Sequence, residues 1–332
     1  MAERAAKGSS AAADARVADP LDARHLGPES LRRYLAANGL RPNRRFSQNF
    51  LADASVLEAI IAAAVLDAPE LPAANVAGQR PDARQVLEIG PGIGILTGAL
   101  LATGAHVVAV EVDPRMVDHL RRRFADAIAD TTLRLVHDDI LERAVGDLVA
   151  PPWDLVANVP YHITSPILHH VLGDEPRPTR FVLMVQREVA ERIAAPPGGM
   201  SYLSVFVQYH ADVSILQVVP ASAFEPAPEV DSAVLIGQTR ARRLEAEGEE
   251  TLWRVVQAGF RERRKMLHNV LPRQLPWLGR DRIEAALLAC DIAPDQRPQT
   301  LSVEAWMALA AALAPLDAAV SPAEHPGAGG RP

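Results

Sequence analysis

The chain has 332 residues and carries 34 Lys and Arg against 41 Asp and Glu, a formal net charge of −7 at pH 7. Its 48% apolar and 23% charged residues are typical of a globular protein and exclude the disordered and fibrous classes. A single cysteine, Cys290, excludes an intramolecular disulfide framework and any multi-cysteine metal site, so we expect a cytoplasmic setting. We also expect no metal, because His169 and His170 are adjacent on a predicted helix and point in different directions. The length predicts about two domains.

The two ends of the chain differ in composition from its middle. Residues 1–27 and 315–332 lack an apolar core, so we expect both to be disordered tails. The run from Ile89 to Val110 contains no charged side chain, but several glycines and one proline interrupt it. This run therefore predicts a strand end, a glycine loop, a buried helix and the next strand, and we expect no membrane-spanning segment.

The first segment after the tail predicts a short helix. Pro28 lies near its start and Gly39 just past its end, which is the usual punctuation of a helix. A basic linker follows, and apolar residues at helical spacing between Val56 and Ala64 predict a second helix. A stretch rich in Pro, Ala, Asn and Gly, from about Asp67 to Gln85, predicts a loop.

Strand-like and helix-like segments then alternate along the chain. The strand-like runs are Val86–Ile89, His106–Val110, Leu133–Val136, Asp154–Ala157 and Arg180–Val185. This alternation predicts an α/β fold with a doubly wound, mostly parallel sheet. Ser201–Tyr209 fits either a helix or a strand, whereas Asp212–Val219 and Val230–Ile236 are expected to close the sheet.

A charged break at Arg240–Glu250 precedes the last part of the chain. Three helix-like segments follow it, at Trp253–Leu271, Asp281–Cys290 and Ser302–Leu313. We therefore predict a sheet domain over 28–240 and a small all-α domain over 250–314.

A glycine loop follows the first strand of the alternating region. Gly90, Gly92 and Gly94 would let the backbone approach a nucleotide, and Glu111 at the end of the next strand could accept both ribose hydroxyls. The G-x-G-x-G spacing differs from the G-x-G-x-x-G dinucleotide fingerprint and suits S-adenosylmethionine, which has no phosphate. Asp139, at the end of the third strand, could accept from the adenine amino group. These residues alone also fit structural glycines beside a solvated acid.

Asn158-Val159-Pro160-Tyr161 follows the fourth strand, at the sheet edge where such folds bind ligands. The Asn158 side-chain oxygen and the Val159 backbone carbonyl could accept hydrogen bonds from a planar amino group and draw it toward tetrahedral geometry. Tyr161 offers a face on which an extruded base could stack. The alternative is that Asn158 caps a turn and Tyr161 packs in a core. Similar motifs occur in enzymes that methylate glutamine amides or DNA adenine.

Five separated blocks make the chain resemble the ribosomal RNA adenine dimethyltransferases, over about Ser30 to Leu313. The blocks are Arg45–Leu51, Leu87–Gly94, Asn158–Tyr161 with Ser165-Pro166, Pro220–Val234 and Phe260–Leu267. The last block, with Arg297–Leu301, is similar to the branch that acts on the small subunit. The resemblance implies a Rossmann-like class I S-adenosylmethionine-dependent methyltransferase domain and a C-terminal helical RNA-binding domain.

The resemblance also implies roles for individual residues. Asn49 and Leu51 would contact the cofactor, and Phe224 would be the second aromatic face beside the target base. The remaining cofactor-binding residues would be Gly90, Gly92, Glu111, Asp139 and Asn158. The implied reaction places two methyl groups on N6 of each of two adjacent adenosines in the 3′-terminal hairpin loop of 16S rRNA.

An acidic net charge is unusual for an RNA-binding protein, so the positions of the basic residues matter. The candidate RNA-binding residues are Arg44, Arg45, Arg187, Arg261, Arg263, Arg264 and Lys265, the last four along one predicted helix. The expected partner is 16S rRNA in the small (30S) subunit, bound by a monomer. Three alternatives stay open: a macrolide-resistance type methyltransferase of large-subunit rRNA, an enzyme for protein amides or DNA adenine, and a ribosome-assembly checkpoint protein.

Overall fold

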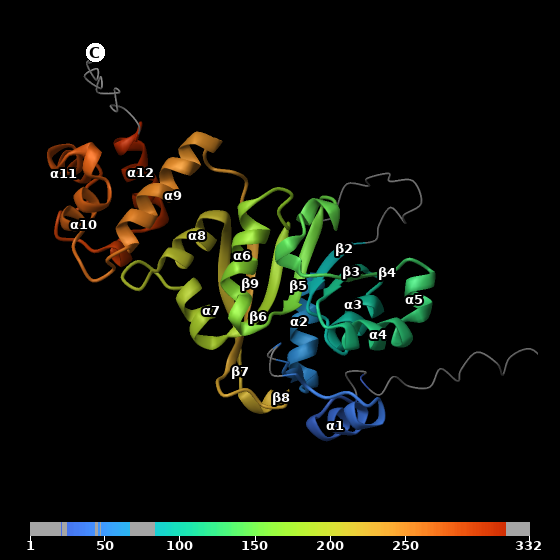
Figure 1. The fold of residues 1–332 in the computed structure, drawn as a ribbon. Helices are drawn as coiled ribbons and strands as arrows, with labels where there is room; N and C mark the ends of the chain where they lie inside the picture. Colours follow the sequence, from blue (N-terminus) through green and yellow to red (C-terminus); the bar gives the residue numbers. More distant parts are fainter. Residues whose placement is uncertain (1–20, 22–24, 44–45, 47, 67–83, 317–332) are drawn as a thin grey trace, which may run out of the picture. The chain divides into compact units, whose positions relative to one another are not determined.

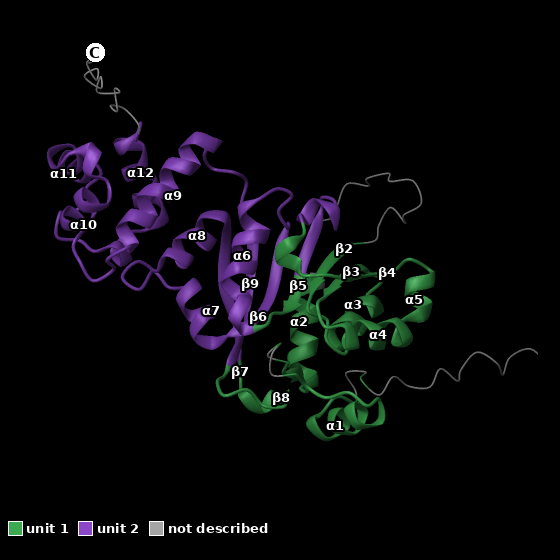
Figure 2. Ribbon diagram, in the orientation of Figure 1, with its two compact units in different colours: residues 1–143, 156–160, 219–231 green, residues 144–155, 161–218, 232–332 purple. Residues whose placement is uncertain are grey.

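A computed structural model describes residues 21, 25–43, 46, 48–66 and 84–316 (Figure 1). The described residues form two compact units, which differ in colour in Figure 2. Unit 1 consists of the described residues within 1–143, together with 156–160 and 219–231. Unit 2 consists of residues 144–155 and 161–218, together with the described residues within 232–332. The two predicted tails lie almost wholly outside the described residues. Each unit is made of several separated ranges, and neither begins or ends at residue 240 or 250. The predicted domain limits therefore stay a prediction.

Unit 1 carries one part of the sheet. Its elements are α1 (Pro28–Ala37), β1 (Phe50–Leu51), α2 (Ala54–Leu66), β2 (Gln85–Ile89), α3 (Ile95–Ala102), β3 (His106–Glu111), α4 (Pro114–Arg123), α5 (Ala125–Ala129), β4 (Leu133–His137) and β8 (Phe224–Glu225). Proline at the start of α1 loses no hydrogen bond, because first-turn N–H groups have no partner within the helix. Gly39, just past its end, has a φ of +65°. The first predicted helix is confirmed.

Strands β2, β3 and β4 pair in parallel, as the alternation predicts. Leu87 of β2 faces Val108 of β3, which in turn faces Arg134 of β4. Residues 86–89 and 107–111 are buried without interruption, which is typical of parallel strands covered on both faces. The uncharged run thus consists of the end of β2, the glycine loop, α3 and β3, which confirms that prediction.

Unit 2 carries the other strands and the C-terminal helices. Its elements are α6 (Thr164–Gly173), β6 (Arg180–Gln186), α7 (Arg187–Ile193), α8 (Tyr202–His210), β7 (Ala211–Val219), β9 (Ser232–Thr239), α9 (Ala246–Phe260), α10 (Leu267–Gln274), α11 (Arg280–Ala289) and α12 (Val303–Leu313). Strand β5 (Trp153–Asn158) contains residues of both units, and Val219, the last residue of β7, belongs to unit 1. The strand order is β4-β3-β2-β5-β6-β9-β7, with β9 antiparallel to β6. The predicted α/β fold and its late closing strands are confirmed.

The segment that fitted either a helix or a strand is helix α8. The Ser201 hydroxyl accepts a hydrogen bond from the Ser204 N–H at 3.2 Å, and the Ser204 hydroxyl accepts one from the Ser201 N–H at 2.8 Å. This reciprocal pair satisfies two backbone donors at the start of the helix. α8 then buries Val205 and Tyr209 in the same apolar core as α9 to α12.

Helices α9 and α12 approach closely at one glycine. Trp306 of α12 is fully buried, and a Cβ added to Gly259 of α9 would lie 2.4 Å from its ring. Any larger residue at position 259 would displace this indole, so glycine is required by packing.

The basic residues Arg261–Lys265 do not lie along a helix, so that prediction is wrong. Helix α9 ends at Phe260 and α10 begins at Leu267. The Leu267 N–H donates to the Gln296 carbonyl at 2.8 Å, and the Leu267 side chain is fully buried. This contact with a distant segment starts a new helix and leaves the basic residues in a turn between the two.

The antiparallel pair of β1 and β8 was not predicted. Leu51 faces Phe224 in this pair, and the Ala52 N–H donates to the Ala223 carbonyl at 2.7 Å. Strands of two residues have no readable periodicity. Only the folded chain shows that these segments, distant in sequence, meet.

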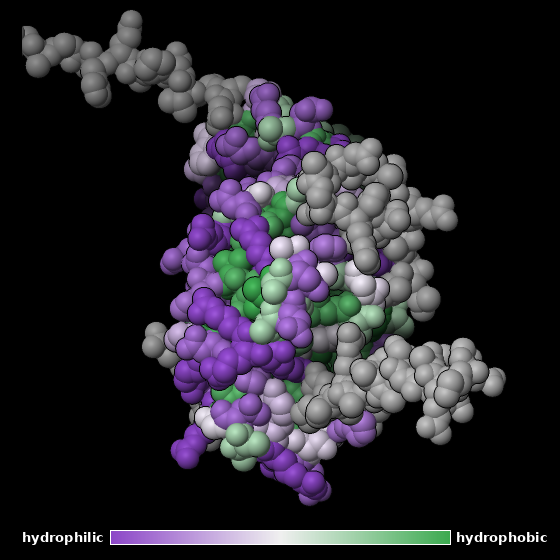
Figure 3. All heavy atoms as spheres, turned by 90° about the vertical axis from the view of Figure 1, so that its right-hand side faces the viewer, coloured by the Kyte–Doolittle hydropathy of each residue, from purple (hydrophilic) through white to green (hydrophobic). Residues whose placement is uncertain are grey.

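Hydrophilic side chains surround smaller hydrophobic patches on the face drawn in Figure 3. Within the described ranges, no helix is long and apolar enough to cross a membrane.

Candidate active site

The glycine loop between β2 and α3 needs glycine for its backbone shape. Gly90, Gly92 and Gly94 have φ values of +69°, +57° and +82°, in a region that glycine adopts without steric cost. A Cβ on Gly92 would lie 2.9 Å from the Phe50 ring, and one on Gly94 would lie 2.5 Å from the Phe124 ring. The G-x-G-x-G pattern therefore serves both the turn and the packing of two aromatic rings against it.

Glu111, at the end of β3, binds the backbone of this loop. Its Oε2 accepts from the Gly92 N–H at 3.0 Å and its Oε1 from the Asp113 N–H at 2.8 Å. Burial raises the pKa of Glu111, and these two donors oppose that shift. Each carboxylate oxygen has two acceptor positions. Glu111 therefore retains capacity to accept ribose hydroxyls, and that contact stays a prediction.

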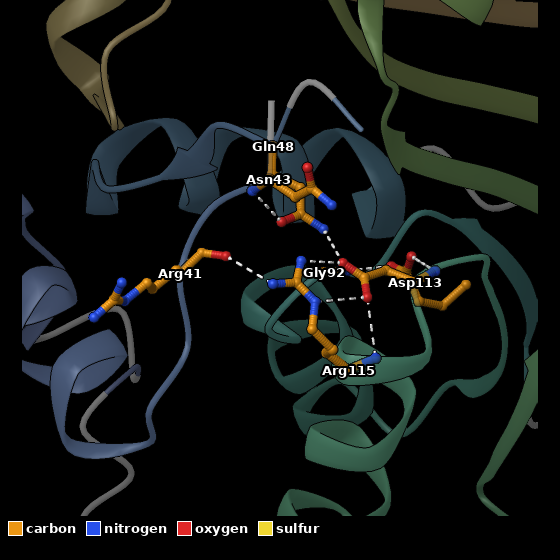
Figure 4. Close-up of polar contacts among 7 residues, drawn as sticks. Arg41, Asn43, Gln48, Gly92, Asp113 and Arg115 are labelled. Carbon is orange, nitrogen blue, oxygen red and sulfur yellow. Dashed lines mark hydrogen bonds and ion pairs between the residues drawn. The ribbon is translucent and has the colours of Figure 1, made fainter. Parts of the chain in front are cut away.

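Asp113 connects the segment before β1 to the turn after β3 (Figure 4). Its Oδ2 accepts from Gln48 Nε2 at 3.0 Å and from Arg115 Nη2 at 2.7 Å. Gln48 Oε1 in turn accepts from the Asn43 N–H at 2.9 Å, and Arg115 Nη1 donates to the Arg41 carbonyl at 3.5 Å. This network connects the segment before β1 to the turn after β3, where the Asp113 N–H donates to Glu111.

The pattern of the sequence does not indicate this network. Asp113 followed by Pro114 is the ordinary signature of a helix N-terminus, and Asp113 does cap α4 by accepting from the Arg115 N–H. Burial alone would raise the pKa of Asp113, but the hydrogen bonds from Arg115 and Gln48 lower it overall. The Asp113 side chain is only 1% exposed, and capping of α4 alone does not explain this burial.

Glu88 is a fully buried carboxyl group in β2, directly before the loop. It accepts a hydrogen bond from Thr97 Oγ1 at 2.6 Å. Burial raises the pKa of Glu88 to about 8, against the opposing effect of the Thr97 bond. Glu88 therefore carries a proton at neutral pH.

Asn158 has its amide anchored at one end. Its Nδ2 donates to the Asn49 carbonyl at 3.3 Å, which leaves Oδ1 able to accept. Pro160 lies against the glycine loop, since a Cβ on Gly90 would be 3.7 Å from Pro160 Cδ, while Val159 is 1% exposed. Unit 1 thus brings together Asn49, Asn158, Pro160 and the glycine loop.

Asp139 and Leu51 occupy more ordinary structural positions. Asp139 Oδ1 accepts from the Leu141 N–H at 2.9 Å and caps the short turn over Ile140–Glu142, while its Oδ2 accepts from no described residue. Leu51 lies in β1 and is 5% exposed. Their contacts with a cofactor stay predictions.

The two proposed base-stacking residues belong to different units. Tyr161, in unit 2, has its hydroxyl oxygen 2.6 Å from Ser232 Oγ, and burial raises its pKa. This bond restricts the orientation of a ring that is partly exposed. Phe224, in unit 1, is only 2% exposed, so a base can stack on it only after its neighbours move. Stacking on either ring stays a prediction.

The candidate RNA-binding residues differ in whether their side chains form ion pairs within the protein. Arg44 and Arg45 lie outside the described residues. Arg187 pairs with Glu191 at 2.7 Å. The side chains at the α9–α10 turn, by contrast, are exposed and form no ion pair with any described carboxylate: Arg261, Arg263, Arg264 and Lys265. Glu262, within the same turn, pairs instead with Arg273 at 3.1 Å.

The donors and acceptors of this site fit S-adenosylmethionine. Glu111 and Asp139 are acceptors for hydroxyl and amino groups, and the Arg115 guanidinium pairs with Asp113 rather than remaining available for a phosphate. In the part of the chain that the structure describes, no group of three or more His, Cys, Asp or Glu side chains could hold a metal ion. The arrangement suits a nucleoside cofactor without a pyrophosphate.

Known proteins resemble this chain over most of its length. The family model for ribosomal RNA adenine dimethylase matches residues 39–314. Ribosomal RNA small subunit methyltransferase A of Geobacter metallireducens is 38% identical over 286 residues, which cover 84% of this chain and 98% of that protein. The protein of the same name from Gloeobacter violaceus is 41% identical over 280 residues, 82% of this chain and 94% of that protein.

Two solved structures are similar as well. The 23S rRNA methyltransferase ErmE has a TM-score of 0.60 and 28% identity, covering 80% of this chain and 99% of that one. A dimethyladenosine transferase from Plasmodium falciparum, at 24% identity, shares the fold with a TM-score of 0.64 over 78% and 95% of the two chains. The fold is the Rossmann-like sheet of class I S-adenosylmethionine-dependent methyltransferases. The chain belongs to the ribosomal RNA adenine dimethylase family.

Proposed function

We propose that this protein transfers methyl groups from S-adenosylmethionine to N6 of two adjacent adenosines in the 3′-terminal hairpin loop of 16S rRNA, two to each. Relatives at 38% and 41% identity, matched over 98% and 94% of their length, are named small-subunit methyltransferases. The 23S rRNA enzyme, at 28% identity, supports the large-subunit alternative less strongly. The observation that carries the chemical part of the proposal is the anchored amide of Asn158.

The reaction must overcome the weak nucleophilicity of the adenine amino group, whose lone pair is delocalised into the ring. Asn158 Oδ1 and the Val159 carbonyl would accept hydrogen bonds from the two N6 hydrogens. Two acceptors outside the ring plane favour tetrahedral nitrogen, and this interaction strengthens as positive charge develops on N6. The bond from Asn158 Nδ2 to the Asn49 carbonyl supports this role, because it engages the amino end of the amide and would leave Oδ1 for the target base.

The cofactor, when bound, supplies a methyl group activated by a sulfonium. Glu111 would hold its ribose hydroxyls and Asp139 its adenine amino group, with Gly90, Gly92 and residues 49–51 completing the contacts. After transfer, the methylated N6 is positively charged and acidic, so its proton leaves to water without a strong base. A second cycle on the same nitrogen gives the dimethylated product.

The target base must leave its stack to reach Asn158. Tyr161 would receive it, and stacking on one aromatic ring contributes about 1–3 kcal/mol per base. We propose Phe224 as the second face. Because its ring is 2% exposed, base binding would have to uncover it.

The α9–α10 turn would contact the RNA backbone. Its four basic side chains are exposed and unpaired by described carboxylates, which leaves their charge available to phosphates. Arg263→Glu with Arg264→Glu should weaken binding to small-subunit particles and reduce its salt dependence. The matched control is Arg121→Glu with Arg122→Glu on the exposed side of α4. Equal binding by the two double variants would show that the turn does not contact RNA.

We further propose that a cytoplasmic monomer acts on the small (30S) subunit during its biogenesis. An assembly-checkpoint role is compatible with this activity. As the only function, it is disfavoured because the motif residues Glu111, Asp139, Asn158 and Tyr161 are all present.

The test is methyl transfer from labelled S-adenosylmethionine. Unmethylated small-subunit particles and large-subunit RNA would be incubated in parallel with the full chain, then digested to nucleosides and mapped. N6,N6-dimethyladenosine at two adjacent small-subunit positions is the expected product. Label in large-subunit RNA alone would refute the proposal in favour of the macrolide-resistance branch. Cofactor binding without label in either RNA would favour a protein amide, DNA or checkpoint role.

A further inference from the structure

An open pocket lies between the start of α8 and the end of α9, wholly within unit 2. Tyr202, Gln257, Phe260 and Arg261 line it, and its volume is about 340 Å³. This volume is at the small end of the range of roughly 300–1,000 Å³ for small-molecule sites. None of the four residues belongs to the proposed methyl-transfer site.

The Tyr202 ring is held in place by its neighbours. It stacks on His169, with ring centroids 5.6 Å apart and an interplanar angle of 25°, and meets Trp253 edge-on at 6.2 Å. Tyr202 is nevertheless only partly buried. Because its neighbours hold the ring and it lines the pocket, the orientation of this aromatic surface is set before any ligand binds.

The Phe260 ring is supported in a similar way. Its centroid lies 5.7 Å from that of buried Trp306, whose approach to α9 depends on Gly259. Phe260 is also only partly buried. The pocket therefore has two aromatic side chains with little freedom to move, so binding a flat ligand there would cost little side-chain entropy.

The polar groups of the pocket suit the edge of a nucleobase. The Gln257 amide can both donate and accept, and the Arg261 guanidinium can stack on a base or bind a phosphate. Both side chains are exposed, and neither forms a side-chain hydrogen bond or ion pair with any residue that the structure describes. Arg263, Arg264 and Lys265 follow within the same turn, so cations for the neighbouring phosphates lie next to the pocket in the chain.

We infer that this pocket binds one unpaired nucleobase of the RNA substrate, at a nucleotide other than the methylated adenosines. The inference rests on the proposed function only in taking the substrate to be RNA. Aromatic residues with an adjacent Arg and an amide are the set that recognises splayed bases in single-stranded RNA. The pocket would therefore add sequence or shape discrimination to a basic turn that by itself reads only phosphates.

Photocrosslinking tests the position of the base. The full chain would be bound to unmethylated small-subunit particles and irradiated with ultraviolet light, which joins stacked bases to aromatic side chains. The expected result is a crosslink from the Tyr202 or Phe260 peptide to one nucleotide other than the methylated adenosines. Crosslinks that map only to other peptides would overturn the inference. A crosslink to a ribosomal protein would identify a different occupant and would also overturn it.

Kinetics with variants test the contribution to binding. Gln257→Ala should raise KM for the particle about 2- to 10-fold with kcat unchanged, as expected for a lost hydrogen bond. Arg261→Gln should also raise KM, and Tyr202→Ala should raise it by about 5-fold or more through lost stacking. The matched controls are Gln274→Ala in α10 and Arg297→Gln, neither of which lines the pocket. Because Tyr202 packs against other rings and Arg261 is also proposed to bind phosphates, the decision rests on exposed Gln257.

Failure of this inference is distinguishable from failure of the proposed function. Normal dimethylation with an unchanged KM for Gln257→Ala and Arg261→Gln would refute the pocket and leave the methyltransferase proposal standing. A mapped crosslink to RNA without methylation of small-subunit adenosines would support the pocket and refute the proposed function.

Discussion

Replacing Asn158 separates the chemistry proposed for its side chain from its part in the fold. The one hydrogen bond that its side chain forms with the described residues, from Nδ2 to the Asn49 carbonyl, is 3.3 Å long. Because the side chain is also partly exposed, losing that bond should destabilise the fold by no more than about 0.5–1.5 kcal/mol. Losing an acceptor that interacts with the positive charge developing on N6 should raise the activation free energy by about 2.7–4 kcal/mol. This increase lowers kcat about 10²- to 10³-fold.

Two substitutions distinguish the acceptor from its anchor. Asn158→Ala removes both. Asn158→Asp keeps an acceptor but places a carboxylate oxygen where the amide now donates to the Asn49 carbonyl, so repulsion between two oxygens should turn the side chain away. We expect both variants to lose most of their kcat at saturating S-adenosylmethionine, where any weaker binding of the cofactor no longer limits the rate.

The assay is single-turnover methyl transfer to unmethylated small-subunit particles, with calorimetric cofactor titration and thermal unfolding of each variant. The matched control is Asn38→Ala, since Asn38 Nδ2 also donates to a backbone carbonyl, that of Tyr34 at 2.9 Å, in an exposed position. Near-normal turnover by Asn158→Ala would remove Asn158 from the mechanism. Equal losses in the control would show that the assay reports stability rather than catalysis.

Three further predictions concern the residues around the glycine loop. The Glu88 pKa of about 8 means that the native state holds a proton which the unfolded chain releases above about pH 4.5, so Glu88 should lower stability as the pH rises from 4.5 to 8. Glu88→Gln should flatten that decline in melting temperature, and an identical pH profile would contradict the buried neutral carboxyl. Gly94→Ala should destabilise the fold by about 2–5 kcal/mol in thermal or urea unfolding, because a left-handed φ and overlap with Phe124 add together. A loss below about 1 kcal/mol would mean that the loop relaxes easily. Asp113→Ala should weaken cofactor binding in calorimetry, because Gln48 and the segment before β1 lose their attachment, whereas an unchanged Kd would confine Asp113 to capping α4.

The local pattern of the sequence determined the parallel strands and the positions at their ends. Runs such as Val86–Ile89 are buried on both faces and are bounded by glycines, so burial and turn formation act on the same few residues. Glu111 and Asn158 were identifiable as candidate site residues for the same reason. Each directly ends a strand, and parallel strands bring their carboxyl ends to one edge.

Contacts between distant segments decided the rest. The bond from Gln48 to Asp113, the pairing of Leu51 with Phe224 and the anchoring of Asn158 by Asn49 join residues far apart in the chain. None of these contacts produces a periodic pattern in the sequence.

The basic turn between α9 and α10 is a further case in which the local sequence does not determine the structure. Its residues have ordinary helix propensity, so the local sequence from Phe260 to Leu267 favours a continuous helix. The break arises because Leu267 is buried and its N–H is bound by the Gln296 carbonyl. Propensities of a few tenths of a kcal/mol per residue cannot resist a buried contact of this kind. The sequence alone thus determined which residues form the strands and end them, and tertiary packing decided how the side chains between them are held.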